Sequence, residues 1–150
     1  MSLDVAYLAA CAADGRTPDP ARTAGMDPDA LYRAAERHML TGITAMALES
    51  AGVRTPAFTQ GRGKAIRKVA ALDVERAAVL EKLEAAGIWY LPLKGAVLKS
   101  LYPALGMREM SDNDILIDAE RADDTAPIME SLGFQQFLFQ HMLHPVQHFA

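Results

Sequence analysis

The sequence has little of several features that mark particular classes of protein. Its 150 residues include a single cysteine, Cys11, so no disulfide can form within the chain and nothing indicates an oxidising compartment. No apolar run approaches the roughly 18 residues that span a bilayer, and the N-terminus lacks a basic stretch followed by an apolar core. We therefore expect a cytoplasmic protein without a membrane partner.

The chain also lacks an excess of basic residues. Its formal net charge is −4 at pH 7, whereas non-specific binding of nucleic acid requires a basic surface that releases counterions from phosphates. A compact substrate suits this charge better. Hydrophobic residues make up 51% of the chain and charged residues 23%, which is typical of a soluble globular protein and argues against disorder.

The hydrophobic pattern predicts helices first and strands later in the chain. We expect helices over residues 3–13, 27–51 and about 62–86, with a loop over 15–25. We then expect a strand over 88–93, a short helix to 102, a strand over 111–118, a helix over 119–132 and a strand over 134–139. This order predicts an α+β fold, in which a helical N-terminal region, residues 1–86, packs on a small mixed β-sheet core, residues 87–150.

Two acids introduce the second predicted strand. Asp112 and Asp114 are two positions apart and precede the apolar run Ile115-Leu116-Ile117, so both carboxylates would lie on one face of that strand. A cation such as Mg²⁺ is commonly held by one or two carboxylates together with substrate phosphates and water. The spacing favours a metal–nucleotide site, and the plainer alternative is a turn acid followed by an edge-strand acid.

A candidate phosphate-binding turn precedes these acids. Lys94-Gly95 falls where the first predicted strand gives way to a short helix that stops before Pro103. N–H groups at such a junction attract anions, and a glycine lets a phosphate approach the backbone. Lys94 would add a point charge. The alternative is a helix-start glycine beside a solvated lysine.

Together these motifs resemble those of a known family. The run LKGAVLKSLYPALGMREMSDNDILID contains, in order, Lys94-Gly95, Leu101-Tyr102-Pro103, Arg108 and Asp112/Asp114. Over residues 66–148 the chain resembles the uncharacterised nucleotidyltransferase-like family of the polymerase-beta superfamily. The resemblance implies that Asp112 and Asp114 bind Mg²⁺ or Mn²⁺ and that Lys94-Gly95 holds the phosphates of a nucleoside triphosphate. It also implies attack on the α-phosphorus by an acceptor, which could be a small molecule, a protein or an RNA end.

The sequence departs from the superfamily pattern in ways that bear on activity. Asn113 stands between the acids where an apolar residue is usual, which predicts a loosely positioned pair. Superfamily enzymes use a third carboxylate from a later strand, and no acid follows Glu130 in this chain. We expect the chain to be a fragment, with that acid beyond residue 150. The alternatives are an inactive nucleotide-binding or regulatory module of the same fold and, if no nucleotide binds, a structural interaction domain.

Three other charged or polar groups have two interpretations each. Arg108 would clamp a phosphate through its planar fork or pair with an acid of its own loop such as Glu109. Arg76 lies three residues after Asp73 on an apolar helix face, which favours an ion pair between them over a role at the phosphate site. The spacing of His141, His144 and His148 suits metal ligands on a helix, but Pro145 interrupts that geometry and favours core or interface positions.

Overall fold

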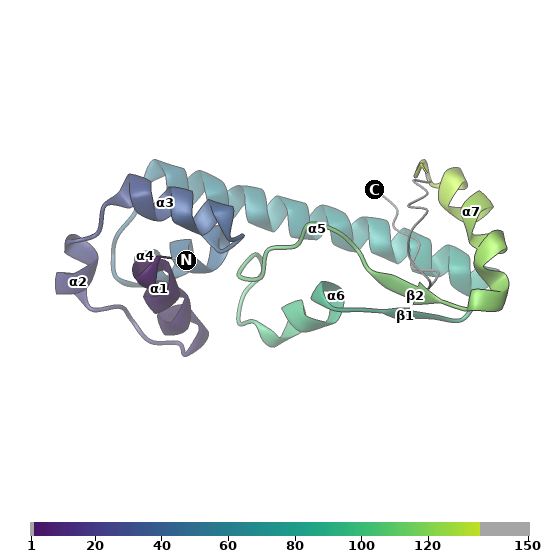
Figure 1. Cartoon of the computed structure of the whole chain (residues 1–150), viewed down its shortest axis with the longest axis horizontal. Coiled ribbons are helices and arrows are strands. Elements are labelled where there is room, and N and C mark those ends of the chain that lie inside the picture. Colours follow the sequence, from purple (N-terminus) through teal and green to yellow (C-terminus); the bar gives the residue numbers. More distant parts are fainter. Residues whose placement is uncertain (1, 136–150) are drawn as a thin grey trace. The chain divides into compact units, whose positions relative to one another are not determined.

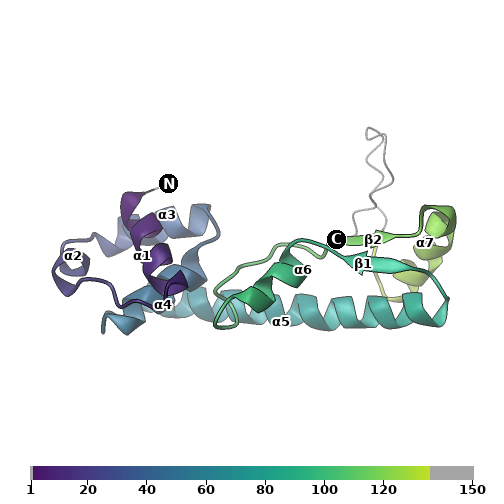
Figure 2. The ribbon, with the colours of Figure 1, turned by 90° about the horizontal axis from the view of Figure 1, so that it is seen from below.

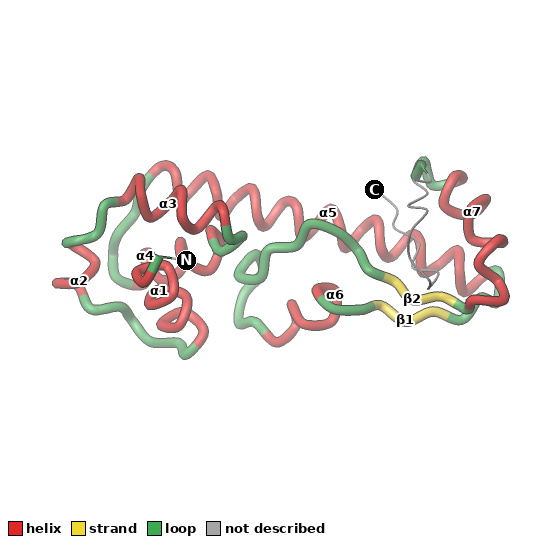
Figure 3. The backbone as a smooth tube through the Cα atoms, in the orientation of Figure 1, coloured by secondary structure: helices red, strands yellow, loops and turns green. Residues whose placement is uncertain are grey.

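The computed structural model describes residues 2–135 of the chain, and these form seven α-helices, two 3₁₀ turns and two short strands (Figures 1 and 3). In chain order the elements are α1 (Leu3–Ala13), α2 (Pro20–Ala24), α3 (Pro28–Arg37), α4 (Thr41–Ser50), α5 (Pro56–Ala85), β1 (Tyr90–Pro92), α6 (Gly95–Leu98), η1 (Lys99–Leu101), β2 (Ile115–Ile117), η2 (Ala119–Arg121) and α7 (Ala122–Ser131). This content is consistent with the predicted α+β class. None of these helices has both the length and the apolar character needed to cross a bilayer.

The described residues divide into two compact units. The first unit contains residues up to 70 together with 98–111, and the second contains residues 71–97 together with 112–135. Helix α5 contributes residues to both units. The segment 98–111 therefore belongs with the helical part of the chain, although it lies between the two strands in sequence. The division that we expect between residues 86 and 87 stays a prediction.

The first unit has a helical core. α1 packs against α3 and α4, and α3 packs against α4, near the start of α5 (Figure 1). The buried residues of this core are Val5, Leu8, Leu31, Ala35, Ala45, Ala47, Leu48 and Phe58. The rings of Tyr32 and Phe58 meet edge to face, with centroids 5.3 Å apart, an arrangement that aromatic pairs prefer. Small alanines let the helices of this unit approach closely.

Residues 27–51 form two helices, so the single helix that we predicted there is wrong. α3 begins at Asp27-Pro28 as predicted, but it ends at Arg37. Met39 adopts a left-handed conformation with φ 54°, and the N–H of Leu40 donates to the carbonyl of Ala35 at 2.9 Å. This is the usual way in which a helix closes its last turn. The apolar spacing continued across the break because both helices face the same core. The loop predicted over 15–25 likewise contains a short helix, α2.

Two glycines and one glutamate hold the segment 98–111 in the first unit. A Cβ atom on Gly42 would lie 1.9 Å from the carbonyl oxygen of Gly106, and one on Gly106, which has φ +83°, would lie 2.7 Å from Cγ1 of Ile66. The carboxylate of Glu109 accepts a hydrogen bond from the backbone N–H of Gly42 at 2.8 Å. Leu40, the N-cap of α4, offers no side-chain acceptor. Glu109 therefore supplies the acceptor and the negative charge that a helix N-terminus favours.

The second unit has a core of its own between a helix pair and a two-stranded sheet. β1 and β2 pair antiparallel, with Tyr90 opposite Ile117 and Pro92 opposite Ile115. Figure 2 shows the strands alongside the part of α5 that belongs to this unit. The buried residues are Val79, Leu83, Ile88 and Met129. The strand predicted over 134–139 runs into residues outside the described part of the chain, so the mixed sheet stays a prediction.

Local signals account for both ends of α5. Thr55 Oγ1 accepts a hydrogen bond from the N–H of Phe58 at 3.4 Å, so the helix begins at Pro56, before the start that we predicted. Gly87 ends it with φ +64°, as predicted. The hydroxyl of Tyr90 in β1 then donates to Glu84 in the last turn of α5. This hydrogen bond is the main cause that raises the pKa of Tyr90 above its ordinary value.

Replacing Glu109 tests whether this residue caps α4. Glu109→Ala removes the only side-chain acceptor at the N-terminus of α4 among the described residues. We expect the free energy of unfolding to fall by about 0.5–2 kcal/mol, the usual effect of losing a helix cap. Urea denaturation followed by circular dichroism measures it. Glu109→Gln keeps an acceptor oxygen and should lose less. Equal stability of Glu109→Ala and wild type would contradict the capping role.

Candidate functional site

The two predicted metal-binding acids lie in a short segment that leads into β2. Residues 112–114, which we call the acid loop, precede the strand, because β2 contains only Ile115–Ile117. The prediction that both acids lie within a strand over 111–118 is therefore wrong. Backbone pairing still reaches one residue beyond the strand, since the N–H of Leu93 donates to the carbonyl oxygen of Asp114 at 2.9 Å. Asp114 is thus placed by the same ladder that joins β1 and β2.

Asn113 fastens the acid loop to α5. Its Nδ2 donates to the carbonyl oxygen of Leu72 at 2.9 Å, and its Oδ1 accepts from Nη1 of Arg76 at 3.0 Å. Arg76 also donates through Nη2 to Asp73 at 2.7 Å. We call these four residues the polar anchor: Leu72, Asp73, Arg76 and Asn113. The expectation that Asn113 leaves the acids loosely positioned is contradicted, because the amide has a partner for both its donor and its acceptor.

The polar anchor also resolves the two interpretations of Arg76. The predicted ion pair with Asp73 is confirmed, with side chains that are 15% exposed for Arg76 and 31% for Asp73. The second hydrogen bond of the Arg76 guanidinium goes to Asn113 in the acid loop. Arg76 is therefore a positioning residue for the loop in this structure. A partly buried network of this kind is sensitive to any deletion, because each loss leaves the remaining partner unsatisfied.

The structure brings Lys94 and Asp114 together. Lys94 Nζ lies 3.1 Å from Oδ2 of Asp114, and the side chains are 71% and 12% exposed, respectively. Lys94 has φ 45°, a left-handed conformation that is costly for a residue with a side chain, while Gly95 already belongs to α6. Because the lysine is mostly exposed, the ion pair contributes little to stability. What it does provide is a positive charge beside the carboxylate of the acid loop.

Asp112 is the exposed member of the pair. Successive side chains of an extended chain point to opposite faces. Because the Asn113 side chain faces α5, we expect those of Asp112 and Asp114 to face away from α5. Their carboxylates then suit a cation that takes its remaining ligands from phosphates and water. They do not suit an all-protein cage, since no group of three or more His, Cys, Asp or Glu residues in the described chain is placed to hold a metal. His141, His144 and His148 lie outside the described residues.

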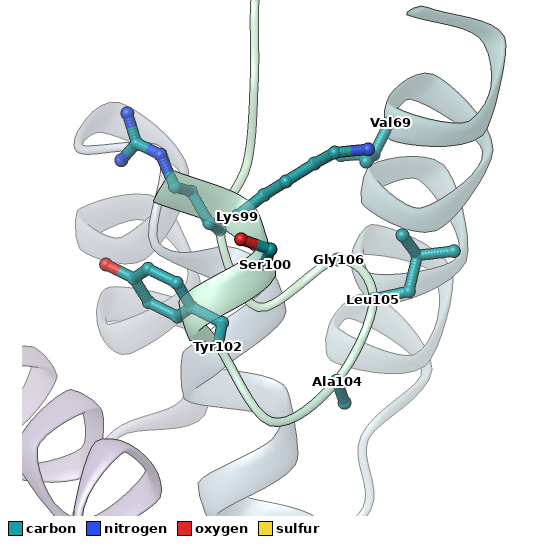
Figure 4. A pocket seen from close by; sticks show the side chains of 8 residues that line it. Val69, Lys99, Ser100, Tyr102, Ala104, Leu105 and Gly106 are labelled. Carbon is teal, nitrogen blue, oxygen red and sulfur yellow. The ribbon is translucent and has the colours of Figure 1, made fainter. Parts of the chain in front are cut away.

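Arg108 belongs to the first unit, where it lines a pocket of about 260 Å³ (Figure 4). The other lining residues are Val69, Lys99, Ser100, Tyr102, Ala104, Leu105 and Gly106. Nε of Arg108 is buried and has no hydrogen-bond partner among the described residues. The alternative partner from the same loop, Glu109, binds the backbone of Gly42 instead.

Sequence reasoning missed Lys99 and Tyr102 as candidate functional residues. They lie three positions apart, Lys99 in η1 and Tyr102 directly after it. That spacing, together with Arg108 downstream, was the available signal. From the sequence alone Asn113 is only a departure from a pattern, because its partners on α5 are about 40 residues away in sequence.

Comparisons with known proteins agree with these motifs. A family model described as an uncharacterised nucleotidyltransferase matches residues 24–148. The match includes the acid loop, Lys94-Gly95 and Arg108, and it begins in the helical part of the chain, well before residue 66. No curated protein and no solved structure matches the chain.

Replacing Asn113 tests the polar anchor. Asn113→Leu removes two hydrogen bonds and leaves the Leu72 carbonyl and one Arg76 donor without their partner. We expect the free energy of unfolding to fall by about 1–3 kcal/mol, measured by urea denaturation. Gln60→Leu, an amide-to-leucine change at an exposed position of α5, is the control and should change stability little. If Asn113→Leu lowers the free energy of unfolding no more than Gln60→Leu does, the polar anchor does not stabilise the fold.

Proposed function

This chain belongs to the uncharacterised nucleotidyltransferase family, and from that membership we propose that it transfers a nucleoside monophosphate from a Mg²⁺-bound nucleoside triphosphate to a hydroxyl or phosphate acceptor. One observation supports the proposal above others. Lys94 Nζ lies 3.1 Å from Asp114 Oδ2, so a residue of the predicted phosphate turn meets a residue of the predicted metal-binding pair. Two motifs that are separate in sequence therefore share one place in the second unit.

In this proposal the acid loop binds the metal. Asp112 and Asp114 would hold Mg²⁺, or Mn²⁺ in its place, together with phosphate oxygens of the nucleotide. The metal would neutralise charge that develops on the attacking and leaving oxygens. Asn113 takes no direct part, because both ends of its amide bind α5. Its role is to keep the two carboxylates where the phosphates arrive.

Lys94 and Gly95 would bind the phosphates. Helix α6 has only four residues, so its dipole is small and the charge of Lys94 must provide most of the attraction. The exposed lysine can turn from Asp114 to a phosphate without disturbing the core, since its side chain is 71% exposed. Gly95 adds a backbone that no side chain shields. Arg108 stays a proposed clamp for a phosphate group.

A nucleotide-binding or regulatory module without turnover is the second candidate. It is favoured by the acid loop itself, because the described residues place no third His, Cys, Asp or Glu with Asp112 and Asp114 to hold a metal. Such a module would bind the nucleotide through the same residues. The two candidates differ in whether pyrophosphate is released. In either, the acceptor or regulated partner is a small molecule, a protein or an RNA end.

Release of pyrophosphate tests the proposed transfer. The chain is incubated with Mg²⁺, each of the four labelled nucleoside triphosphates and sets of small-molecule, protein and RNA acceptors. We expect pyrophosphate with at least one nucleotide. In the double variant Asp112→Asn/Asp114→Asn its release should fall by at least about 100-fold, because loss of metal ligands exceeds the effect of losing their outer partners.

The control for this experiment is Asp29→Asn/Asp123→Asn, which changes the charge equally at two exposed acids in the first turns of α3 and α7. It should retain the wild-type rate. Calorimetry with the same nucleotides separates the two candidates. Nucleotide binding without pyrophosphate favours the regulatory module, and absence of both binding and pyrophosphate overturns both candidates.

A further inference from the structure

The pocket around Arg108 has the chemistry of an anion-binding site. Two cations, Lys99 and Arg108, line it, and no carboxylate is among its lining residues. Ser100 and Tyr102 add hydroxyl groups to the same lining. Figure 4 shows the side chains of Lys99, Ser100 and Tyr102 projecting from one short turn of the chain. Cationic side chains with nearby hydroxyl groups are suited to a phosphate or carboxylate group.

The buried Nε of Arg108 is an independent indication of a ligand. This nitrogen is a donor with no hydrogen-bond partner among the described residues. Buried polar groups are nearly always hydrogen-bonded, and an exception requires an explanation. A guanidinium presents its donors in a planar fork that matches two oxygens of one phosphate. An oxygen of a bound anion would satisfy the donor that residues 2–135 leave unpaired.

The size and the remaining walls of the pocket indicate what the anion is attached to. Val69, Ala104 and Leu105 add apolar groups to the lining, which suits an uncharged body better than a second charged group. The volume of about 260 Å³ lies below the roughly 300–1,000 Å³ of pockets that enclose drug-sized ligands. The pocket is therefore too small to enclose a whole nucleoside triphosphate and large enough for a small phosphate ester.

We propose that this pocket binds the phosphate group of a small phosphorylated molecule. Arg108 forms the fork on the phosphate, Lys99 supplies the second charge, and Ser100 and Tyr102 donate hydroxyl hydrogen bonds. The proposal deepens the phosphate clamp assigned above to Arg108, and in that respect it rests on the proposed function. It requires neither metal nor turnover, so it can be tested without them.

Binding is measured by calorimetry on the full chain, without Mg²⁺ and without nucleotide. The probes are inorganic phosphate, phenyl phosphate as an ester with an apolar body, and phenol as the body alone. We expect saturable binding of phenyl phosphate, weaker binding of inorganic phosphate and none of phenol. Tighter binding of inorganic phosphate than of the ester would overturn the assignment of a phosphorylated molecule.

The variants identify the residues that bind the probe. Arg108→Gln should weaken phenyl phosphate binding at least about tenfold, as expected for a lost charged hydrogen bond. Tyr102→Phe keeps the ring and should weaken it less, while still folding as wild type does. Arg33→Gln removes the same charge at an exposed position of α3 and should leave binding unchanged. Equal binding by Arg108→Gln and wild type, or equal loss in Arg33→Gln, overturns the proposal.

A further variant separates this proposal from the proposed transfer reaction. Asp112→Asn/Asp114→Asn lies outside the pocket lining and should bind phenyl phosphate as wild type does. If it does so while the wild type releases no pyrophosphate from any nucleotide, the pocket stands and the transfer reaction fails. If the double variant loses phenyl phosphate binding, the probe binds through the acid loop and the pocket assignment is overturned.

Discussion

The candidate site depends on the pair of hydrogen bonds that joins Asn113 to α5. The strand that follows the acid loop has only three residues and one partner strand in the described chain, and an isolated two-stranded sheet is marginally stable. Such a strand cannot by itself hold two carboxylates in place. The bonds to the Leu72 carbonyl and to Arg76 connect the loop to a 30-residue helix. A polar residue between the acids thus anchors the acid loop.

The two units carry candidate sites of opposite charge. The second unit presents the carboxylates of the acid loop, with Lys94 beside one of them. The first unit presents Lys99 and Arg108 in a pocket without carboxylates. Each arrangement is suited to a ligand of its own, since carboxylates bind cations, and guanidinium and ammonium groups bind anions. The pocket in the first unit is therefore lined by positive side chains, although the net charge of the chain is −4.

Local signals predicted much of the fold, and long-range contacts explain what they missed. Composition predicted α1, and apolar periodicity with Gly87 predicted most of α5, because those signals are local in the sequence. The break at Met39 was missed because the left-handed position is occupied by methionine, where glycine is the usual signal. The cap of α4 could not be predicted from the sequence, because Glu109 comes from a loop that is distant along the chain. The motifs predicted that Lys94 and Asp114 share one site, and in the structure their side chains lie 3.1 Å apart. The hydrogen bonds of Asn113 could not be predicted, because their partners come from a distant part of the chain, α5.

The central claim is that the anchored acid loop presents Asp112 and Asp114 to one cation shared with a nucleotide. A crystal structure of the chain with Mn²⁺ and a non-hydrolysable nucleoside triphosphate tests it most directly, because anomalous scattering locates Mn²⁺ without ambiguity. We predict one anomalous peak in contact with both carboxylates and with phosphate oxygens, and Asn113 still bonded to α5. A nucleotide-bound structure in which the metal contacts neither carboxylate, or in which the two carboxylates point apart, would contradict the account.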